Sequence, residues 1–446
     1  MPIELRCECG KRLRVRDELL GKRGKCPVCG KILVIRPTVQ PVEQETGEIP
    51  LADEPAPPVA RRAPVAVAAA RPAVVRQPAV ARPAPRSAAR AAPASPLESQ
   101  PVGAPALAGV REYLYCALLL ALLPLAWSTF LAHDDIKSRI EHTISANRAQ
   151  LKGLGEDASM DEFLAALPGD RIEGAHLPRQ TTVHWAYAAI SAIAFFSLIA
   201  SLFPGRLSRP KYLVGAGMFT ATVGIVLLIV LQFLAEWSQG FWLRGRSIIV
   251  VIFYVVKFIG FSYRMAEDPN YNWFLSFLGF TCGVGLCEEV CKALPVLWRS
   301  RQGKLMTWRD AAVWGLASGV GFGVSEGITY ASRHYNGIHT GEIYVVRFAS
   351  CVALHAVWSA SAALTLYRRQ GLLEAAENGW EWFARLLVIV GIPMVLHGLY
   401  DTLLKKDMGA AALATAAVSF AWLAFQIETS RKREQAAEAG VAGASA

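Results

Sequence analysis

The sequence predicts an all-α polytopic membrane protein with eight or nine transmembrane helices, a small N-terminal zinc ribbon and a disordered linker rich in proline and alanine. Composition predicts the membrane part: hydrophobic residues make up 53% of the 446-residue chain, charged residues only 18%, and the mean hydropathy is +0.31. The apolar residues gather in long runs, each close to the roughly 20 residues that a spanning helix needs. Two pairs of cysteines near the N-terminus predict the ribbon.

The ribbon is expected in residues 1–36. Cys7 and Cys9, and then Cys26 and Cys29, form two pairs that are each followed by glycine, and short alternating runs beside them suit strands. Two pairs of thiolates on tight turns suit a tetrahedral structural zinc, and four thiolates leave that zinc no open position for catalysis. The thiols predict a reducing, cytoplasmic location. We expect the ribbon to be a docking or sensing module with a cytoplasmic protein partner. Nucleic acid is not the expected partner, because the ribbon has few aromatic residues that could stack on bases.

The rest of the chain divides by composition. Residues 37–112 hold much Pro, Ala, Val and Arg without amphipathic period, which indicates a disordered linker. Residues 113–246 are expected to form N-terminal membrane helices, with a polar loop at 133–183 that caps the membrane part from outside. Residues 247–427 are expected to form the core, and 428–446 a disordered C-terminal tail.

Nine segments are candidate membrane spans: 113–132, 184–204, 213–235, 247–266, 273–298, 308–332, 347–367, 384–404 and 409–427. Basic residues at 299–309, at Arg368 and Arg369, and at 431–433 predict cytoplasmic loops. We therefore expect an integral protein of the cell (inner) membrane, in contact with membrane lipid, whose N-terminal ribbon is cytoplasmic. Nine crossings would put the termini on opposite sides, so one early segment is expected to be re-entrant or merged with a neighbour.

Ionisable residues occur inside four of these spans. An ionisable residue within a membrane helix is costly, so its presence suggests a functional site. Glu288 and Lys292, like His397 and Asp401, are four residues apart and face the same way on a helix. Carboxylates and imidazoles from four helices can bind a metal or activate water. The full set comprises Glu288, Glu289, Lys292, Glu326, His355, His397 and Asp401.

The order of these residues resembles the PrsW family of intramembrane proteases, which belongs to a wider group with the CAAX prenyl endopeptidases. The matching motifs, over roughly 247–427, are Glu288-Glu289-Val-Cys-Lys292, Phe322-Gly-Val-Ser-Glu326, His355 and His397-Gly-Leu-Tyr-Asp401. The prenyl endopeptidases usually carry a histidine where this chain has Glu326, as PrsW-like members do. The ribbon, the linker and the loop at 133–183 lie outside the resemblance.

The resemblance implies an intramembrane endopeptidase that hydrolyses a peptide bond of a membrane-tethered protein, such as an anti-sigma factor. It implies that Glu288 or Glu289 is the general base on a water, and that Lys292 offsets the charge of this pair. His355 and His397 would ligate a zinc or stabilise the oxyanion, and Asp401 would orient His397. Glu326 would be a further ligand or a hydrogen-bond partner. As a ligand, it would hold a catalytic zinc together with His355 and His397. Metal-dependent and metal-free glutamate mechanisms both remain open at this point.

Two other functions fit the same residues. In a non-catalytic membrane sensor or scaffold, the ribbon would recruit a partner and the buried polar residues would only tie helices together. In an ion-coupled or proton-coupled transporter, charged residues would line a pathway. A transporter predicts internal repeats among the spans, and the sequence contains no convincing one.

Overall fold

The structure, a computed structural model, describes residues 3–6, 12–15, 23–26, 28–29, 32–34, 107–131, 135–155, 158–205, 208–303 and 307–444. The chain divides into two compact units, Met1–Ala94 and Ser95–Ala446. The first contains two antiparallel hairpins, β1 (Ile3–Arg6) with β2 (Arg12–Val15) and β3 (Arg23–Lys25) with β4 (Ile32–Val34). Cys26 is buried and Cys29 is exposed. Cys7, Cys9 and the linker up to residue 106 lie outside the described residues, so the zinc ribbon stays a prediction.

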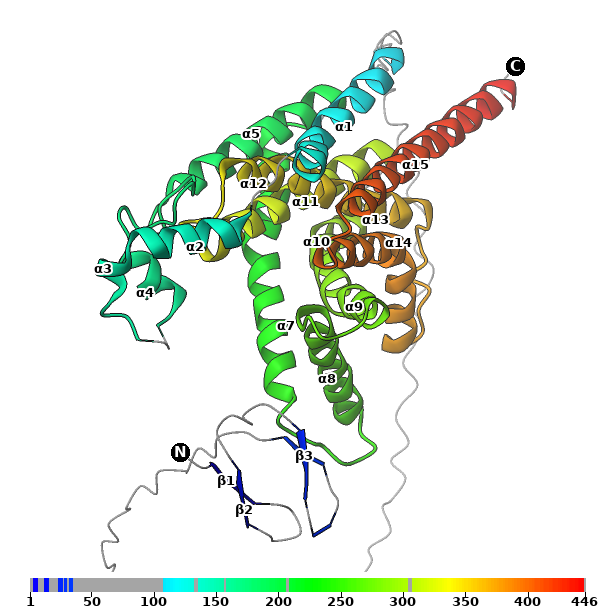
Figure 1. The fold of residues 1–446 in the computed structure, drawn as a ribbon. Coiled ribbons are helices and arrows are strands. Elements are labelled where there is room, and N and C mark those ends of the chain that lie inside the picture. The colour runs from blue at the N-terminus through cyan, green and yellow to red at the C-terminus, as the bar shows by residue number, and fades with distance from the viewer. Residues whose placement is uncertain are drawn as a thin grey trace, which may run out of the picture. The chain divides into compact units, whose positions relative to one another are not determined.

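The second unit is helical (Figure 1). Its α-helices are α1 (Leu107–Phe130), α2 (Ile136–Ala146), α3 (Arg148–Leu151), α4 (Met160–Ala165), α5 (Val183–Leu202), α6 (Pro210–Phe219), α7 (Ile225–Ser238), α8 (Ile248–Glu267), α9 (Trp273–Gly279), α10 (Leu286–Arg301), α11 (Trp308–Tyr330), α12 (Gly341–Val345), α13 (Val352–Arg368), α14 (Gly379–Lys405) and α15 (Gly409–Ala444). Wider π-helical turns join three pairs into continuous helices: η2 (Thr220–Gly224) between α6 and α7, η3 (Phe280–Gly285) between α9 and α10, and η5 (Val346–Cys351) between α12 and α13. A fourth, η4 (Ala331–Tyr335), extends α11.

Seven helices in the described part of the chain are long and apolar enough to cross a membrane: Val183–Leu202, Pro210–Ser238, Ile248–Glu267, Trp273–Arg301, Gly341–Arg368, Gly379–Lys405 and Gly409–Ala436. The chain is thus an integral membrane protein, with seven such helices where the sequence predicted eight or nine. The other two predicted spans, α1 and α11, are helical but are not among these seven. Within the described part of α1, the apolar stretch is Leu120–Phe130. Helix α11 is rich in glycine and alanine because it packs inside the bundle, where small residues replace the bulky apolar ones that face lipid.

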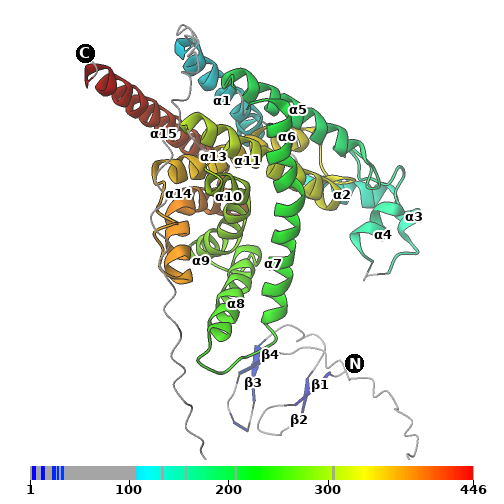
Figure 2. The same ribbon diagram turned by 180° about the vertical axis from the view of Figure 1, so that it is seen from behind.

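Helices α11 and α13 form the centre of the helical unit, which both views show surrounded by other helices (Figure 2). Four glycines spaced four apart on α11, Gly315, Gly319, Gly323 and Gly327, face α13 and η5. A Cβ on Gly315 would lie 2.5 Å from Ala360 Cα, and one on Gly319 would lie 2.2 Å from the carbonyl oxygen of His355. The glycines therefore let the two backbones approach closely and bring His355 against α11.

The basic segments predicted to be cytoplasmic gather at one end of the helical unit. Trp308 Nε1 donates to Glu434 at 2.9 Å, so the start of α11 meets the last turns of α15. Arg368, Arg369 and Arg433 line a common cavity. This common end agrees with the predicted common side for these segments, and the side of the membrane itself stays a prediction.

The loop predicted at 133–183 forms a small cap that contains α2, α3 and α4. Helix α4 starts with a capping box, in which Ser159 and Glu162 satisfy each other's backbone N–H groups. Leu164, Leu167, Ile172 and Ala175 form a core that packs against Ile338 of the segment between η4 and α12. The cap therefore packs on the segment that follows α11, the helix that carries Glu326.

The C-terminal tail differs from its prediction. Residues 428–446 were expected to be disordered, but α15 continues to Ala444. The tail is rich in alanine, glutamate, lysine and arginine, which favour helix. Glu428 also pairs with Arg431 at 2.8 Å, one turn further along the helix.

Candidate active site

Helix α10 carries three of the predicted residues directly after the π-helical turn η3. Glu289 and Lys292 are fully buried, and Glu288 is 5% exposed. Lys292 Nζ lies 2.7 Å from Glu289 Oε1 and 3.4 Å from Glu288 Oε2. The sequence predicted that Lys292 would pair with Glu288, and the structure places Lys292 nearer to Glu289. Lys292 therefore bridges both carboxylates, because an ammonium group can point three donors in different directions.

His355 on α13 links Lys292 to Glu326. Lys292 Nζ lies 2.8 Å from His355 Nδ1, and His355 Nε2 lies 2.6 Å from Glu326 Oε2. An ammonium group can only donate and a carboxylate can only accept. The contacts therefore assign the proton of a neutral His355 to Nε2, with Nδ1 as the acceptor.

His397 on α14 has the opposite tautomer. Its Nδ1 lies 3.0 Å from Glu289 Oε1, so this nitrogen carries the proton. Its Nε2 faces Glu288 Oε2 at 3.7 Å and Asp401 Oδ2 at 3.4 Å. The ring stacks on Trp358, with a distance of 4.3 Å between ring centroids. Glu289 and Trp358 together fix the ring and leave the lone pair of Nε2 directed toward the carboxylates.

Glu326 on α11 is held by a residue that was not predicted. Arg347, on the π-helical turn η5, is 9% exposed and places Nη2 2.8 Å from Glu326 Oε2. Arg347 is the first residue of the predicted span 347–367. At the end of a span, a long basic side chain is expected to reach the membrane surface. The structure begins this helix at Gly341, so Arg347 lies inside it. Trp358 was also missed, although it follows His355 by one helical turn.

A cavity of about 880 Å³ opens beside these groups. Its walls come from α1, α7, α8, α9–α10, α11, η5, α13, α14 and the start of α15. Of the predicted residues, the five that line this cavity are Glu288, Glu326, His355, His397 and Asp401. Glu289 and Lys292 do not line it, so they lie behind the groups that can reach a ligand.

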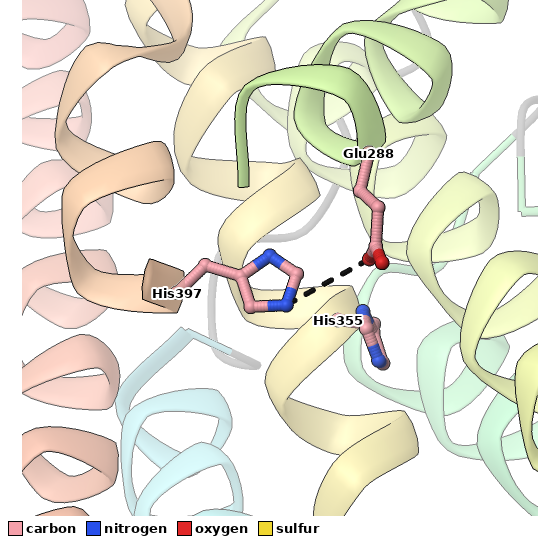
Figure 3. A group of neighbouring side chains, drawn as sticks. All are labelled: Glu288, His355 and His397. Carbon is pink, nitrogen blue, oxygen red and sulfur yellow. Dashed lines mark ion pairs between the residues drawn. The ribbon is translucent and has the colours of Figure 1, made fainter. Parts of the chain in front are cut away.

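Glu288, His355 and His397 form a potential metal centre (Figure 3). One ligand atom from each lies within 4.8 Å of the others. Glu288 Oε2 is buried and accepts no hydrogen bond from any residue that the structure describes. The sequence predicted Glu326 as the carboxylate of this trio. In the structure Glu326 lies 2.8 Å from Arg347 Nη2 and 2.6 Å from His355 Nε2, and Glu288 takes its place in the trio.

The charge balance of the site also suits a divalent cation. Four carboxylates, Glu288, Glu289, Glu326 and Asp401, meet two permanent cations, Lys292 and Arg347. With both histidines neutral and all four carboxylates ionised, the site carries two net negative charges, which protons or a divalent ion would neutralise. Uncompensated charge in a protein interior is strongly unfavourable, so a divalent ion at the trio would restore neutrality.

These features define a class: a polytopic α-helical membrane protein with a buried glutamate–histidine site at a cavity between its helices. Residues 208–426 match the model of the PrsW family of intramembrane metalloproteases. The match covers just under half of the chain, includes all seven predicted site residues, and supports the PrsW family and an intramembrane protease. No curated protein and no solved structure matches the chain.

Proposed function

We propose that the chain is an intramembrane endopeptidase that hydrolyses a peptide bond of a membrane-tethered protein. The observation that carries this proposal is the trio of Glu288, His355 and His397 at the wall of a cavity of about 880 Å³ among membrane helices. Hydrolysis needs a water, a group that takes its proton and donors that stabilise the oxyanion. The trio supplies a carboxylate and two imidazoles for these roles. A substrate anchored in the same membrane is the one that reaches this cavity.

Glu288 is proposed to act directly on the water. It lines the cavity, its nearest cation is 3.4 Å away, and its Oε2 accepts no hydrogen bond from the described residues. Glu289 is a poorer candidate, because it is fully buried and contacts both Lys292 and His397. Glu289 instead holds His397 so that Nε2 faces the cavity wall. This divides the roles of the two adjacent glutamates, which the sequence could not separate.

The remaining polar residues position the reacting groups. Lys292 donates to Glu289 and to His355 Nδ1, which fixes α10 against α13. Glu326, held by Arg347, accepts from His355 Nε2. A site whose groups are already oriented by such contacts loses less free energy to reorganisation during the reaction.

A metal ion fits this site. The residues that would hold it are Glu288, His355 and His397, a combination that suits catalytic zinc with an open fourth position. Both nitrogens of His355 are engaged in this structure, so His355 would have to exchange its contact with Lys292 or with Glu326 for the metal. When bound, such an ion would polarise the scissile carbonyl and lower the pKa of a water. With Glu288 engaged as a ligand, Asp401 is the cavity-lining carboxylate that can accept the proton of the water, 3.4 Å from His397 Nε2.

The central test of this function is Glu288→Gln. We expect this variant to lose activity toward a membrane-tethered peptide by about 10²–10⁴-fold, because the amide can neither accept a proton nor supply a negative charge. The measurement is cleavage by the purified protein in detergent, followed by mass spectrometry of the products. Glu374→Gln, on an exposed segment between α13 and α14, is the matched control and should cleave like the wild type.

Equal cleavage by Glu288→Gln and wild type would refute the assignment of Glu288. If the wild type cleaves no tethered peptide under any condition while Glu288→Gln changes only stability, the scaffold or sensor function is favoured instead.

Zinc content tests the two predicted metal sites separately. We expect two zinc ions per chain in the wild type, one in Cys26→Ser/Cys29→Ser and one in His397→Ala, because each change removes ligands from a different site. The measurement is elemental analysis of the purified protein. Retention of both ions in His397→Ala would exclude His397 as a ligand.

A further inference from the structure

A second cavity is lined by residues of α13, α14 and α15 and by Arg369, and none of them lines the active-site cavity. Its volume is about 370 Å³. Three arginines line it: Arg368 and Arg369 at the C-terminal end of α13, and Arg433 on α15. Aliphatic side chains of α14 and the ring of Trp422 form the remaining wall. The cavity therefore combines a strongly cationic part with an apolar part.

The three arginines have no acidic partner. No ion pair in the described part of the chain involves Arg368, Arg369 or Arg433, although other basic residues nearby are paired. Arg309 pairs with Glu434 at 3.4 Å, and Arg431 pairs with Glu428 at 2.8 Å. Three guanidinium groups around one cavity repel each other unless an anion lies between them. Guanidinium groups bind phosphate in particular, because their paired N–H groups match its oxygens.

Trp422 gives an independent indication of a ligand. Its Nε1 is buried but donates to no acceptor among the described residues. Two other tryptophans that contact α15 do have acceptors: Trp358 Nε1 donates to Ser419 Oγ at 3.0 Å, and Trp308 Nε1 to Glu434 at 2.9 Å. A buried N–H without an acceptor is costly, so a ligand oxygen that reaches Nε1 of this cavity-lining residue would satisfy it.

We propose that this cavity binds one anionic phospholipid, with its phosphate group among Arg368, Arg369 and Arg433. The apolar wall selects a lipid over free phosphate. Val388 and Ile392 of α14 line the cavity and are 48% and 46% exposed, so they offer a surface on which an acyl chain can lie. Basic pockets between membrane helices are typical headgroup sites. The cavity shares no residue with the active-site cavity, so this proposal is independent of the proteolytic function.

The test measures lipid binding by the full-length protein in detergent, using native mass spectrometry with added phosphatidylglycerol. We expect Arg368→Gln/Arg369→Gln/Arg433→Gln to weaken binding about a hundredfold, because each basic residue at an anionic lipid surface contributes roughly fivefold. Trp422→Phe keeps the ring and removes the N–H, and we expect about tenfold weaker binding. This single conservative change keeps the test valid if the triple variant does not fold.

The matched control removes the same charge elsewhere. Lys137→Gln/Arg148→Gln/Lys152→Gln alters three exposed residues of the cap and should change binding less than twofold. Equal losses in both triple variants would show bulk electrostatic attraction and overturn the proposal. Equal binding of phosphatidylcholine, or displacement of the lipid by an equal concentration of inorganic phosphate, would overturn it as well, as would unchanged binding in both pocket variants.

Discussion

Replacement of Lys292 by methionine is expected to destabilise the fold by about 3–5 kcal/mol and to abolish proteolysis, because it leaves buried charge without its partner. Lys292 is fully buried and lies 2.7 Å from Glu289 and 3.4 Å from Glu288. It also lies 2.8 Å from His355 Nδ1, so the change also removes the partner of that nitrogen. The measurement is the apparent midpoint of thermal unfolding in detergent.

Two further variants test whether Lys292→Met acts through the buried charges. Lys137→Met, at an exposed position of the cap, should leave the midpoint unchanged. Lys292→Met/Glu289→Gln should recover part of the lost stability, because it removes one of the unpaired charges as well. If Lys292→Met is as stable as the wild type, the buried charge network does not exist as described.

Gly319→Ala is expected to destabilise the protein by about 3 kcal/mol, at the upper end of the usual cost of overpacking. The new Cβ would lie 2.2 Å from the carbonyl oxygen of His355 and 2.5 Å from Ala356 Cα. Both opposing atoms belong to backbone, so no side chain can rotate away, and α11 and α13 must separate. Because His355 moves with α13, catalytic activity should fall together with stability.

Gly391→Ala provides the matched comparison. Gly391 lies within α14, and a Cβ there meets no atom within 4 Å. The substitution should leave stability unchanged or raise it by about 0.5–1 kcal/mol, because alanine favours helix over glycine. Thermal unfolding of both variants measures the difference. Equal midpoints would contradict the close contact between α11 and α13.

Particular features of the fold could be predicted because they depend on local pattern. Apolar runs of about 20 residues predict membrane helices wherever they occur, and the nine predicted segments are all helical in the structure. The C-terminal tail was missed because its charged and alanine-rich composition suits both a solvated helix and a disordered segment.

Local sequence pattern does not predict which residues of the candidate site contact one another. The sequence placed ionisable residues on four helices, but residues 21 to 109 positions apart, from Glu326–Arg347 to Glu288–His397, meet only through packing. Packing places Lys292 nearer to Glu289 than to Glu288, and it pairs Glu326 with Arg347. It also leaves Glu288 Oε2 without a hydrogen bond from the described residues. Arg347 escaped prediction because its helix starts a turn and a half earlier than the apolar run does.

The sequence by itself determined that this chain spans a membrane and that acidic residues and histidines lie within its spans, because the hydropathy and periodicity of a helix depend only on neighbouring residues. Only the tertiary structure decided which of these side chains meet, which tautomer each histidine adopts and which carboxylate joins the two histidines in the trio. Those choices depend on helix rotation and on distances of 3–4 Å between different helices, which are set by close packing at glycines and by the π-helical turns before Glu288 and around Arg347.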